Sequence, residues 1–348
     1  MYKELADAEK QLLIAALQTA EAQETTNLEK LRQAGAKYFR RYLLDWSEAF
    51  PSLIAKGLLR EQERVYSLTE EGESQAKEAR QERPGMWYWY NDYYIAMRES
   101  KAHALFCERL YGMNLCQHGF MDMSQLARLL EVTKLNTLSR VLDIGCGNGM
   151  IANGCSSPAH ISDLTGAHIC GIDNIAEAIR QARERTPHKR DRLIFQEQDL
   201  NQLDYPANSF GSALHCYTIL SIDTIYFSND YSETLRRMKA IIRPGGQMAF
   251  FYTHAVKSDE PRESLLVDRT PLAEAFHNNA LRFEVWDLTQ ADYRHAQRKK
   301  QIVEELKAAF EAEGNLFLYE NRIAEAKGHL EKTAEGRMVR YLYRATFG

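Results

Sequence analysis

Residues 141–150 read VLDIGCGNGM, a mostly apolar run that passes directly into three glycines at alternate positions. The run 141–144 predicts a buried β-strand, and a helix is predicted from Met150 onward. Gly145 and Gly147 let the backbone turn tightly and approach a ligand, while the first turn of a helix offers N–H groups that have no partner inside the helix. The stretch therefore predicts a ligand-binding loop between a strand and a helix.

Two details separate this loop from the glycine-rich loop of nicotinamide-binding proteins. The glycines run G-x-G-x-G, and Met150 stands where the dinucleotide pattern G-x-G-x-x-G has its third glycine. Asp143, two residues before the first glycine, would repel a pyrophosphate and attract a ligand that carries an ammonium group. The loop therefore favours a cationic ligand.

Beyond the loop, short apolar runs alternate with helical patterns. The predicted strands are 141–144, 168–172, 193–195, 210–216, 247–252, 283–288 and 337–347, and the predicted helices include 175–182, 231–242, 291–313 and 321–332. Alternation of this kind indicates an α/β fold with a parallel, doubly wound sheet.

The ordered set of motifs resembles the class I S-adenosylmethionine-dependent methyltransferases over roughly residues 110–255. An acidic residue ends the second strand at Ile172-Asp173, Gln198-Asp199-Leu200 follows the third strand, and Arg-Pro-Gly-Gly at 243–246 precedes the fifth. Phe210 opens the fourth strand as in the family, although Gly211 stands where the family usually has Asp. The resemblance implies a Rossmann-like seven-stranded methyltransferase sheet with an antiparallel seventh strand. It also implies S-adenosyl-L-methionine (SAM) as the cofactor and S-adenosyl-L-homocysteine as its product.

The resemblance also implies cofactor-binding roles for residues of these motifs. Asp173 is expected to bind the ribose hydroxyls, and Asp199 is expected to lie at the adenine amino group. Both have a structural alternative, since Asp173 could cap the next helix and Asp199 could be an ordinary loop carboxylate. The expected cofactor-binding residues are Tyr111, Gln117, Asp143, Gly145, Cys146, Gly147, Asp173, Asn174, Asp199, Leu200 and His215.

Methyl transfer is a direct displacement at a sulfonium, so the protein mainly aligns the acceptor, and a general base is needed only for a hydroxyl or a protonated acceptor. Three segments are expected to line the acceptor site: 111–119, whose "YG…HG" pattern resembles the cap segment of small-molecule methyltransferases, and two strand ends, 215–218 and 252–254. The candidate catalytic residues are His118, Tyr217, His215 and His254. A histidine at a strand end can equally be a hydrogen-bonded structural group. No carboxylate set of the metal-dependent catechol type is evident, so no metal is predicted.

An insertion of about fifty residues, around 290–335, separates the sixth and seventh strands and is predicted to be largely helical. In many small-molecule enzymes of the family an insertion at this point forms a lid over the acceptor. Its mixed charge is also typical of a solvated helix face. A lid and a simple scaffold both fit this pattern.

Residues 1–84 predict a separate, mainly helical domain. Three helices precede the apolar runs 57–60 and 65–69, which flank a charged turn and predict a β-hairpin. This order resembles a winged helix. Residues 1–85 hold 13 Lys and Arg against 15 Asp and Glu, and the wing tip carries Glu61 and Glu63, so binding to DNA phosphates is disfavoured. Because small-molecule methyltransferases often carry a similar module, we expect it to dimerise the chain or cover the substrate.

Composition bounds the location and the partners. The chain has 348 residues and a formal net charge of −4, which excludes bulk binding of nucleic acid by excess positive charge. Its six cysteines form no CxxC pair and indicate buried thiols in a reducing cytosol. Charged residues interrupt the first twenty positions, and no uninterrupted apolar run could span a membrane, so a cytoplasmic protein is expected.

The sequence thus predicts three parts: the winged-helix-like domain 1–84, a helical linker and cap at 85–130, and a SAM-binding methyltransferase domain at 131–348. The predicted function is methyl transfer to a small-molecule nitrogen or oxygen, with carbon as a third option, by a homodimer. Two alternatives stay open: a methyltransferase of RNA or protein, and a non-catalytic SAM-sensing winged-helix regulator.

Overall fold

The computed structural model describes residues 5–116, 118–150, 161–203 and 216–346. The chain divides into two compact units, Met1–Tyr93 and Tyr94–Gly348. The division falls inside helix α5 (Gly85–Glu99), nine residues after the boundary expected at residue 84. The aromatic run of α5 therefore contributes residues to both units.

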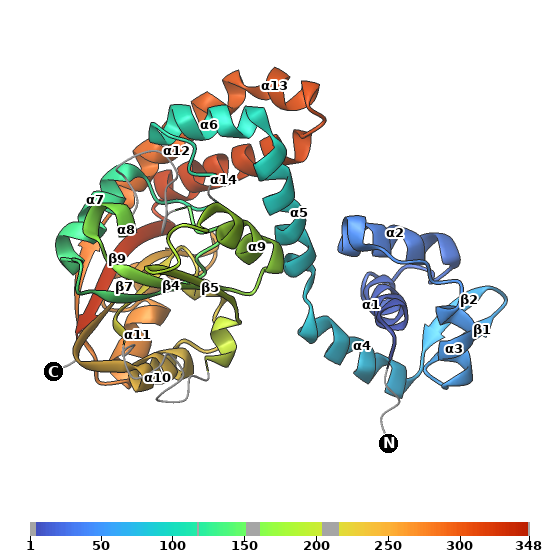
Figure 1. The fold of residues 1–348 in the computed structure, drawn as a ribbon. Helices are drawn as coiled ribbons and strands as arrows, with labels where there is room; N and C mark the ends of the chain where they lie inside the picture. Colours follow the sequence, from blue (N-terminus) through green and yellow to red (C-terminus); the bar gives the residue numbers. More distant parts are fainter. Residues whose placement is uncertain (1–4, 117, 151–160, 204–215, 347–348) are drawn as a thin grey trace. The chain divides into compact units, whose positions relative to one another are not determined.

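The first unit has the predicted order of three helices followed by a two-stranded hairpin. Its elements are α1 (Asp7–Glu21), α2 (Leu28–Phe39), α3 (Ala49–Ala55), β1 (Leu59–Gln62), β2 (Val65–Leu68) and α4 (Glu70–Glu82), with the 3₁₀ turn η1 (Arg40–Tyr42) after α2 (Figure 1). Glu61 and Gln62, expected in the turn, belong to β1, and the two-residue turn consists of Glu63 and Arg64, both with positive φ. Such a turn matches the twist of the paired strands.

Helix α1 forms the core of this unit. Its six consecutive residues from Leu12 to Leu17 are all buried, so the helix is covered on every side. α2, α3 and α4 pack around it. The buried surface of α1 is therefore wider than the single apolar stripe of a helix that packs on one side only.

A seven-stranded sheet forms the centre of the second unit. Its strands are β3 (Arg140–Ile144), β4 (His168–Asp173), β5 (Leu193–Glu197), β6 (Cys216–Ile222), β7 (Ile242–Ala255), β8 (Arg282–Asp287) and β9 (Met338–Thr346). The order across the sheet is β5-β4-β3-β6-β7-β9-β8. β9 pairs antiparallel with β7 and β8, and the other pairs are parallel. The predicted Rossmann-like methyltransferase sheet and its antiparallel last strand are confirmed.

Helices cover both faces of the sheet. One apolar core lies against α10 (Tyr231–Ile241) and α11 (Pro271–Asn278), and the other lies against α7 (Met123–Thr133), α8 (Ile161–Thr165) and α9 (Ala176–Arg185). The short 3₁₀ turns η2 (Leu200–Gln202), η3 (Ile225–Phe227) and η4 (Glu263–Leu265) follow β5, β6 and β7. The cysteines whose side chains are described, at 107, 116, 146 and 170, are buried and form no disulfide with one another, as the sequence predicts.

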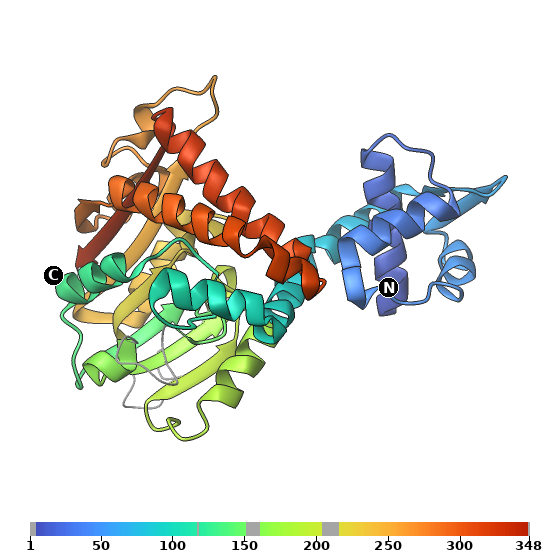
Figure 2. The same cartoon turned by 90° about the horizontal axis from the view of Figure 1, so that it is seen from above.

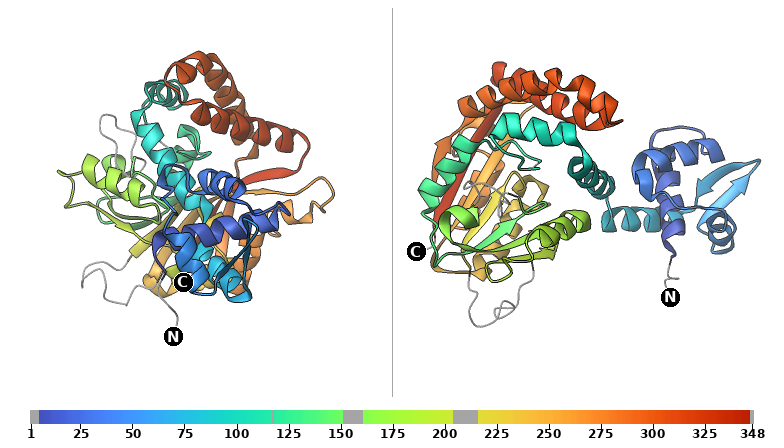
Figure 3. Two further views of the ribbon diagram at one scale, coloured as in Figure 1. Left: turned by 90° about the vertical axis from the view of Figure 1, so that its right-hand side faces the viewer. Right: turned by 45° about the horizontal axis from the view of Figure 1, so that its top comes forward.

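Four further helices pack together in this unit. α6 (Lys101–Tyr111), α12 (Thr289–Glu305), α13 (Lys307–Ala312) and α14 (Leu316–Ala334) lie side by side, with α12 and α14 also contacting β9 (Figures 1 and 2). Figure 3 shows the same group from two other sides. The last three helices are the predicted insertion, which we call the lid.

Two strands differ from the prediction. The fourth strand, expected at 210–216, is β6 at 216–222, and residues 210–215 lie outside the described part of the chain. Both segments contain apolar residues, so the pattern alone could not choose between them, and pairing of Thr218–Ser221 with β3 decides. The fifth strand begins at Ile242, five residues early, because the residues between Ile242 and Gln247 form a bulge opposite β6. The helix expected from Met150 lies mostly in residues that are not described.

Candidate active site

The site is centred on the carboxyl ends of β3 and its two neighbours. β4 lies on one side of β3 and β6 on the other, so the chain leaves β3 for one direction and later returns to the opposite side. Ligands of open α/β sheets bind in the crevice at such a point. The glycine-rich loop after Ile144 occupies this position.

The glycine-rich loop can have no side chains at two of its positions. A Cβ at Gly145, which has φ +72°, would stand 2.1 Å from the hydroxyl of Thr224, just after β6. A Cβ at Gly147, with φ +56°, would stand 2.6 Å from the hydroxyl of Tyr94. The N–H groups of Gly145 and Cys146 both donate to the Ile172 carbonyl, which fixes the loop against β4. Glycine is thus required at both positions by the positive φ and by the close approach of a side chain from another element.

Asp173 joins the loop to the following helix. Its Oδ2 accepts the Gly147 N–H at 2.9 Å and its Oδ1 accepts the Ile175 N–H at 2.9 Å. Burial raises the pKa of Asp173 to about 6, and these N–H donors limit the rise. The carboxylate remains partly exposed, so it can accept further donors from a ligand. Asp173 does not cap α9, whose N-cap is Ile175 and has no side-chain cap hydrogen bond, but it fixes the turn that leads into this helix.

Asp143 is a buried carboxylate that has no counter-charge among the residues that the structure describes. It is 3 % exposed, and none of the residues that the structure describes donates a hydrogen bond to it. Burial, together with the nearby Asp173, raises its pKa to about 7. A carboxylate in this state is stabilised by a cation that enters the crevice.

The remaining cofactor candidates lie at the same edge of the sheet with differing surroundings. Asp199 caps η2, accepting the Asn201 N–H at 2.8 Å, and Leu200 is buried in the core against α10 and α11. Asn174 is exposed beside Asp173. The Cys146 thiol is buried, and burial raises its pKa well above the ordinary value, so it is a neutral packing group.

A loop between α6 and α7, residues 112–122, crosses above this edge; we call it the cap loop. The Asn148 side-chain amide donates to the Cys116 carbonyl at 2.9 Å, which ties the loop to the glycine-rich segment. The N–H groups of Phe120 and Met121 donate to Asp223, just after β6, at 2.7 and 3.1 Å. His118 lies between these two attachments. Tyr111, at the base of the loop, is buried with its ring 5.7 Å from that of His295, and Gln117 lies outside the described residues.

His118 faces a carboxylate from the lid. Its Nε2 lies 2.9 Å from Oε1 of Glu325 on α14. Burial lowers the pKa of His118, and Glu325 opposes only part of this shift, so the imidazole is neutral at physiological pH. Burial alone would raise the pKa of Glu325, but Lys299, 2.7 Å away, and Arg322, 3.3 Å away, help to hold it well below the ordinary value. The pair therefore combines a neutral imidazole with an ionised carboxylate.

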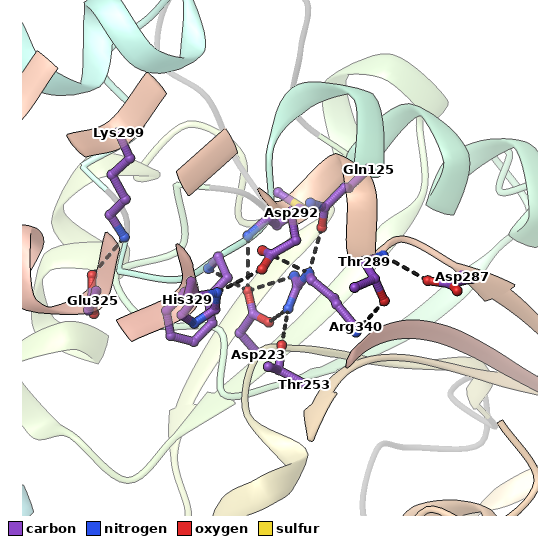
Figure 4. A network of polar contacts seen from close by, with 12 residues as sticks. Gln125, Asp223, Thr253, Asp287, Thr289, Asp292, Lys299, Glu325, His329 and Arg340 are labelled. Carbon is purple, nitrogen blue, oxygen red and sulfur yellow. Dashed lines mark hydrogen bonds and ion pairs between the residues drawn. The ribbon is translucent and has the colours of Figure 1, made fainter. Parts of the chain in front are cut away.

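Sequence reasoning missed a buried polar network that connects these parts (Figure 4). Its centre is Arg340 on β9, which is fully buried and bonds to Asp223 at 2.6 Å. The other members are Gln125, Thr253, Asp292, Lys299, Glu325 and His329. The mixed charge of the lid was interpreted as typical of a solvated face, and for Asp292 and Lys299, both 2 % exposed, that interpretation is wrong. Both residues lie on the buried face of α12, among the apolar residues Ala296, Ile302 and Val303. A charged residue within such an apolar face is the one sequence feature that could have predicted their burial.

The other catalytic candidates are not brought to His118. Tyr217 was chosen as a residue at the carboxyl end of its strand, and that placement is wrong, since it is the second residue of β6, at the opposite edge from the glycine-rich loop. His215 lies outside the described residues. His254 is near the carboxyl end of β7, where it lies 3.2 Å from the Ser264 hydroxyl and its ring stacks on Tyr252. Tyr252 belongs to the core on the α10 and α11 face, whereas Phe251 belongs to the core on the α7 face.

No helix among the described residues is long and apolar enough to cross a membrane. Within the same ranges, no group of three or more His, Cys, Asp or Glu side chains is arranged to hold a metal ion.

Solved structures similar to this chain share its fold. A phosphoethanolamine N-methyltransferase of Haemonchus contortus, in complex with phosphomonomethylethanolamine and S-adenosylhomocysteine, superposes with a TM-score of 0.58 at 19% identity, over 74% of this chain and 60% of that one. The cyclopropane synthase MmaA2 of Mycobacterium tuberculosis superposes with a TM-score of 0.55 at 13% identity, over 74% of this chain and 98% of that one.

Sequence comparison gives curated relatives and a family. The 27-O-demethylrifamycin SV methyltransferase of Amycolatopsis mediterranei (strain S699) is 27% identical over 42% of this chain and 54% of its own length. An aklanonic acid methyltransferase of Streptomyces sp. (strain C5) is 32% identical over 35% of this chain and 52% of its own length. The match thus spans about half the length of these relatives. The sequence model of one family, described as a methyltransferase domain, matches residues 135–318, more than half of the chain, and the chain therefore belongs to that methyltransferase family.

Proposed function

We propose that this protein transfers a methyl group from SAM to a small-molecule acceptor at the carboxyl edge of β3. The observation that carries the proposal is Asp143, a buried carboxylate with a pKa raised to about 7 and no donor from the described residues. The amino group of SAM supplies the cation that such a group lacks. The relatives named above are methyltransferases of small molecules by name, which supports the same class of acceptor.

The residues around Asp143 fit the rest of this cofactor. Asp173 has carboxylate lone pairs left for ribose hydroxyls after its two backbone bonds. The glycine-rich loop, whose positive φ values favour glycine, is proposed to lie against the methionine part. Asp199, Leu200 and Asn174, all at this edge, are proposed for the adenine side. SAM supplies an electrophilic methyl group on a sulfonium, and the chain holds it and excludes water.

On the acceptor side we propose His118 as the group that takes a proton. Its neutral imidazole can accept the proton of a hydroxyl as the oxygen attacks the methyl carbon, while the carbon–sulfur bond breaks and its electron pair remains on sulfur. The imidazolium formed is stabilised by the Glu325 carboxylate 2.9 Å away. This arrangement favours an oxygen acceptor, or a nitrogen acceptor that arrives protonated, over carbon.

Titration calorimetry with S-adenosylhomocysteine tests the cofactor, with NADH as the control ligand on the same sample. Micromolar binding of S-adenosylhomocysteine and no response to NADH is the expected result. Binding of NADH would overturn the assignment. His118→Gln should then lower kcat with a screened acceptor by about 10²-fold or more, the usual contribution of a positioned base, while leaving cofactor affinity unchanged.

For the N-terminal unit we propose dimerisation rather than binding of nucleic acid. One face of α2 exposes Leu28, Glu29, Arg32, Gln33 and Ala36, and Leu28 is 41 % exposed there. A Leu28→Glu variant should shift the mass measured by light scattering from dimer to monomer. An electrophoretic shift of genomic fragments at low salt would instead support the SAM-sensing regulator, and methylation of bulk RNA or protein would support a macromolecular acceptor. A cytoplasmic location stays a prediction.

A further inference from the structure

Two ion pairs join the lid helices α12 and α14 on the side of the cap loop, and we call them the rungs. α12 and α14 are joined by Lys299–Glu325 at 2.7 Å and by Asp292–His329 at 2.7 Å. Asp292 and Lys299 are seven residues apart, and Glu325 and His329 are four apart, so each pair of positions lies on one face of its helix. The two rungs therefore fix how α14 presents Glu325 toward His118.

The cap loop is fixed by a different carboxylate. Asp223 Oδ2 accepts the N–H groups of both Phe120 and Met121. A Cβ at Gly119 would stand 3.1 Å from that same oxygen, so the loop leaves no room for a side chain between Gly119 and the carboxylate. Asp223 has φ +58°, a conformation that a non-glycine residue keeps only when its surroundings hold it. His118 lies two residues before Phe120, the first residue whose N–H Asp223 accepts.

Arg340 connects the lid rungs to the cap-loop carboxylate. Its guanidinium bonds to Asp223 at 2.6 and 3.2 Å, and its Nε lies 3.7 Å from Asp292. It also donates to Gln125 on α7 and to Thr253 on β7, both at 2.8 Å. Figure 4 shows Arg340 between Asp223 and Asp292, with His329 beyond the latter. One buried cation thus touches both supports of the His118–Glu325 contact.

Building on the function proposed above, we propose that Arg340 is a positioning residue for methyl transfer: through Asp223 it fixes the cap loop that carries His118, and through Asp292 it fixes the lid helices that carry Glu325. The network contains the cations Arg340 and Lys299 and the anions Asp223, Asp292 and Glu325, and Arg322 adds a third cation 3.3 Å from Glu325. Such a balance of charge offsets the cost of burying these groups. Arg340 contacts neither ligand and acts only by holding the two sides of the pair in register.

Histidine-selective NMR tests the proposal without a known acceptor. The His118 signals are assigned by their loss in His118→Gln, and Glu325→Gln defines the shift that follows loss of the contact. Asp292→Asn, which keeps the Arg340–Asp223 bond, should move the His118 signals toward their positions in Glu325→Gln. Asp223→Asn should do the same and should also speed amide exchange at Phe120 and Met121 by about tenfold, since a charged acceptor is lost. Arg340→Lys, which keeps the charge but not the fork of donors, should move the signals part of the way.

The matched control is Arg344→Gln, which removes another arginine–carboxylate pair of β9, the one with Glu284 at 2.9 Å. It should leave the His118 signals in place. Unchanged His118 signals in both Asp292→Asn and Asp223→Asn, or in Glu325→Gln, would overturn the proposal, as would an equal shift in the control. Binding of S-adenosylhomocysteine is measured on every variant and should vary by less than about threefold, because Arg340 acts on the acceptor side. Failure of the wild type to bind S-adenosylhomocysteine would contradict the proposed function alone, since the NMR comparison does not depend on it.

Discussion

The carboxyl edge of β3 and the network around Arg340 are held together in opposite ways. At the edge, neighbouring stretches of chain are joined through backbone groups: Gly147 and Ile175 donate N–H bonds to Asp173, and Ile172 accepts two from the glycine-rich loop. In the network, side-chain charges join different elements of the fold, as Arg340 of β9 joins Asp223, 117 residues before it. At the edge, no described residue carries a charge that pairs with Asp143, whereas each charged residue of the network has a partner of opposite charge. The difference indicates that the edge is built to receive a charged ligand and the network to remain closed.

The largest effect is expected from breaking the network at its centre. Arg340→Met leaves Asp223 and Asp292 buried without their cation, which should lower the free energy of unfolding by about 3–5 kcal/mol. Urea denaturation followed by circular dichroism measures this. If the two regions are independent, the affinity for S-adenosylhomocysteine under native conditions stays within about threefold of the wild type. A large loss of affinity in a folded variant would contradict the comparison.

The converse change is Asp173→Ala at the edge. Two charge-assisted contacts to ribose hydroxyls are removed, so the affinity for S-adenosylhomocysteine should fall by about 100-fold, or roughly 2.7 kcal/mol. Stability should change less, because the lost backbone bonds are offset by removal of a carboxylate whose pKa burial has raised to about 6. Calorimetry and urea denaturation on the same sample separate the two effects, and wild-type affinity would remove the ribose assignment.

Asp143 gives the stability of the edge a dependence on pH that tests the comparison. Its folded-state pKa of about 7 lies above the ordinary value of 3.8, so the folded protein binds the extra proton and loses stability as pH rises between these values. Asp143→Asn should therefore be more stable than the wild type by about 2 kcal/mol at pH 8, roughly half of the full linkage value, because Asn is also a buried polar group. The difference should shrink toward pH 5. A variant that is less stable than the wild type at pH 8 would mean that Asp143 has a cationic partner in the chain.

The smallest effect on stability is expected from Arg344 on β9, whose partner Glu284 is exposed. Arg344→Gln removes an ion pair with the exposed Glu284 and a 2.7 Å hydrogen bond to Gln247, and exposed pairs contribute less than about 1 kcal/mol. The free energies of unfolding of the variant and the wild type should agree within about 0.5 kcal/mol. A higher salt concentration should reduce even that difference, because it screens exposed charges. A larger loss would show that position on β9, rather than burial, makes Arg340 important.

The parts that could be predicted from the sequence are those whose contacts are local. The strands that end at Ile144 and Asp173 and the glycine-rich loop between them follow from apolar runs and glycines within a few residues of one another, and the sheet with its antiparallel last strand is as predicted. The predicted position of the fourth strand was wrong because two neighbouring segments both carry apolar residues, and only pairing with β3 selects one of them. His118 was found as part of a local pattern, but its partner Glu325 was not, because no local rule relates positions 118 and 325.

By itself the sequence determined the fold class, the glycine-rich loop and the acidic residues at strand ends, because each depends on backbone geometry or on neighbours along the chain. Only the tertiary structure decided which charges of the lid are buried, which carboxylate faces His118 and which strand edge each candidate occupies. Burial of a charge is stable only when a countercharge from another element reaches it, and that pairing exists only once distant segments have packed together.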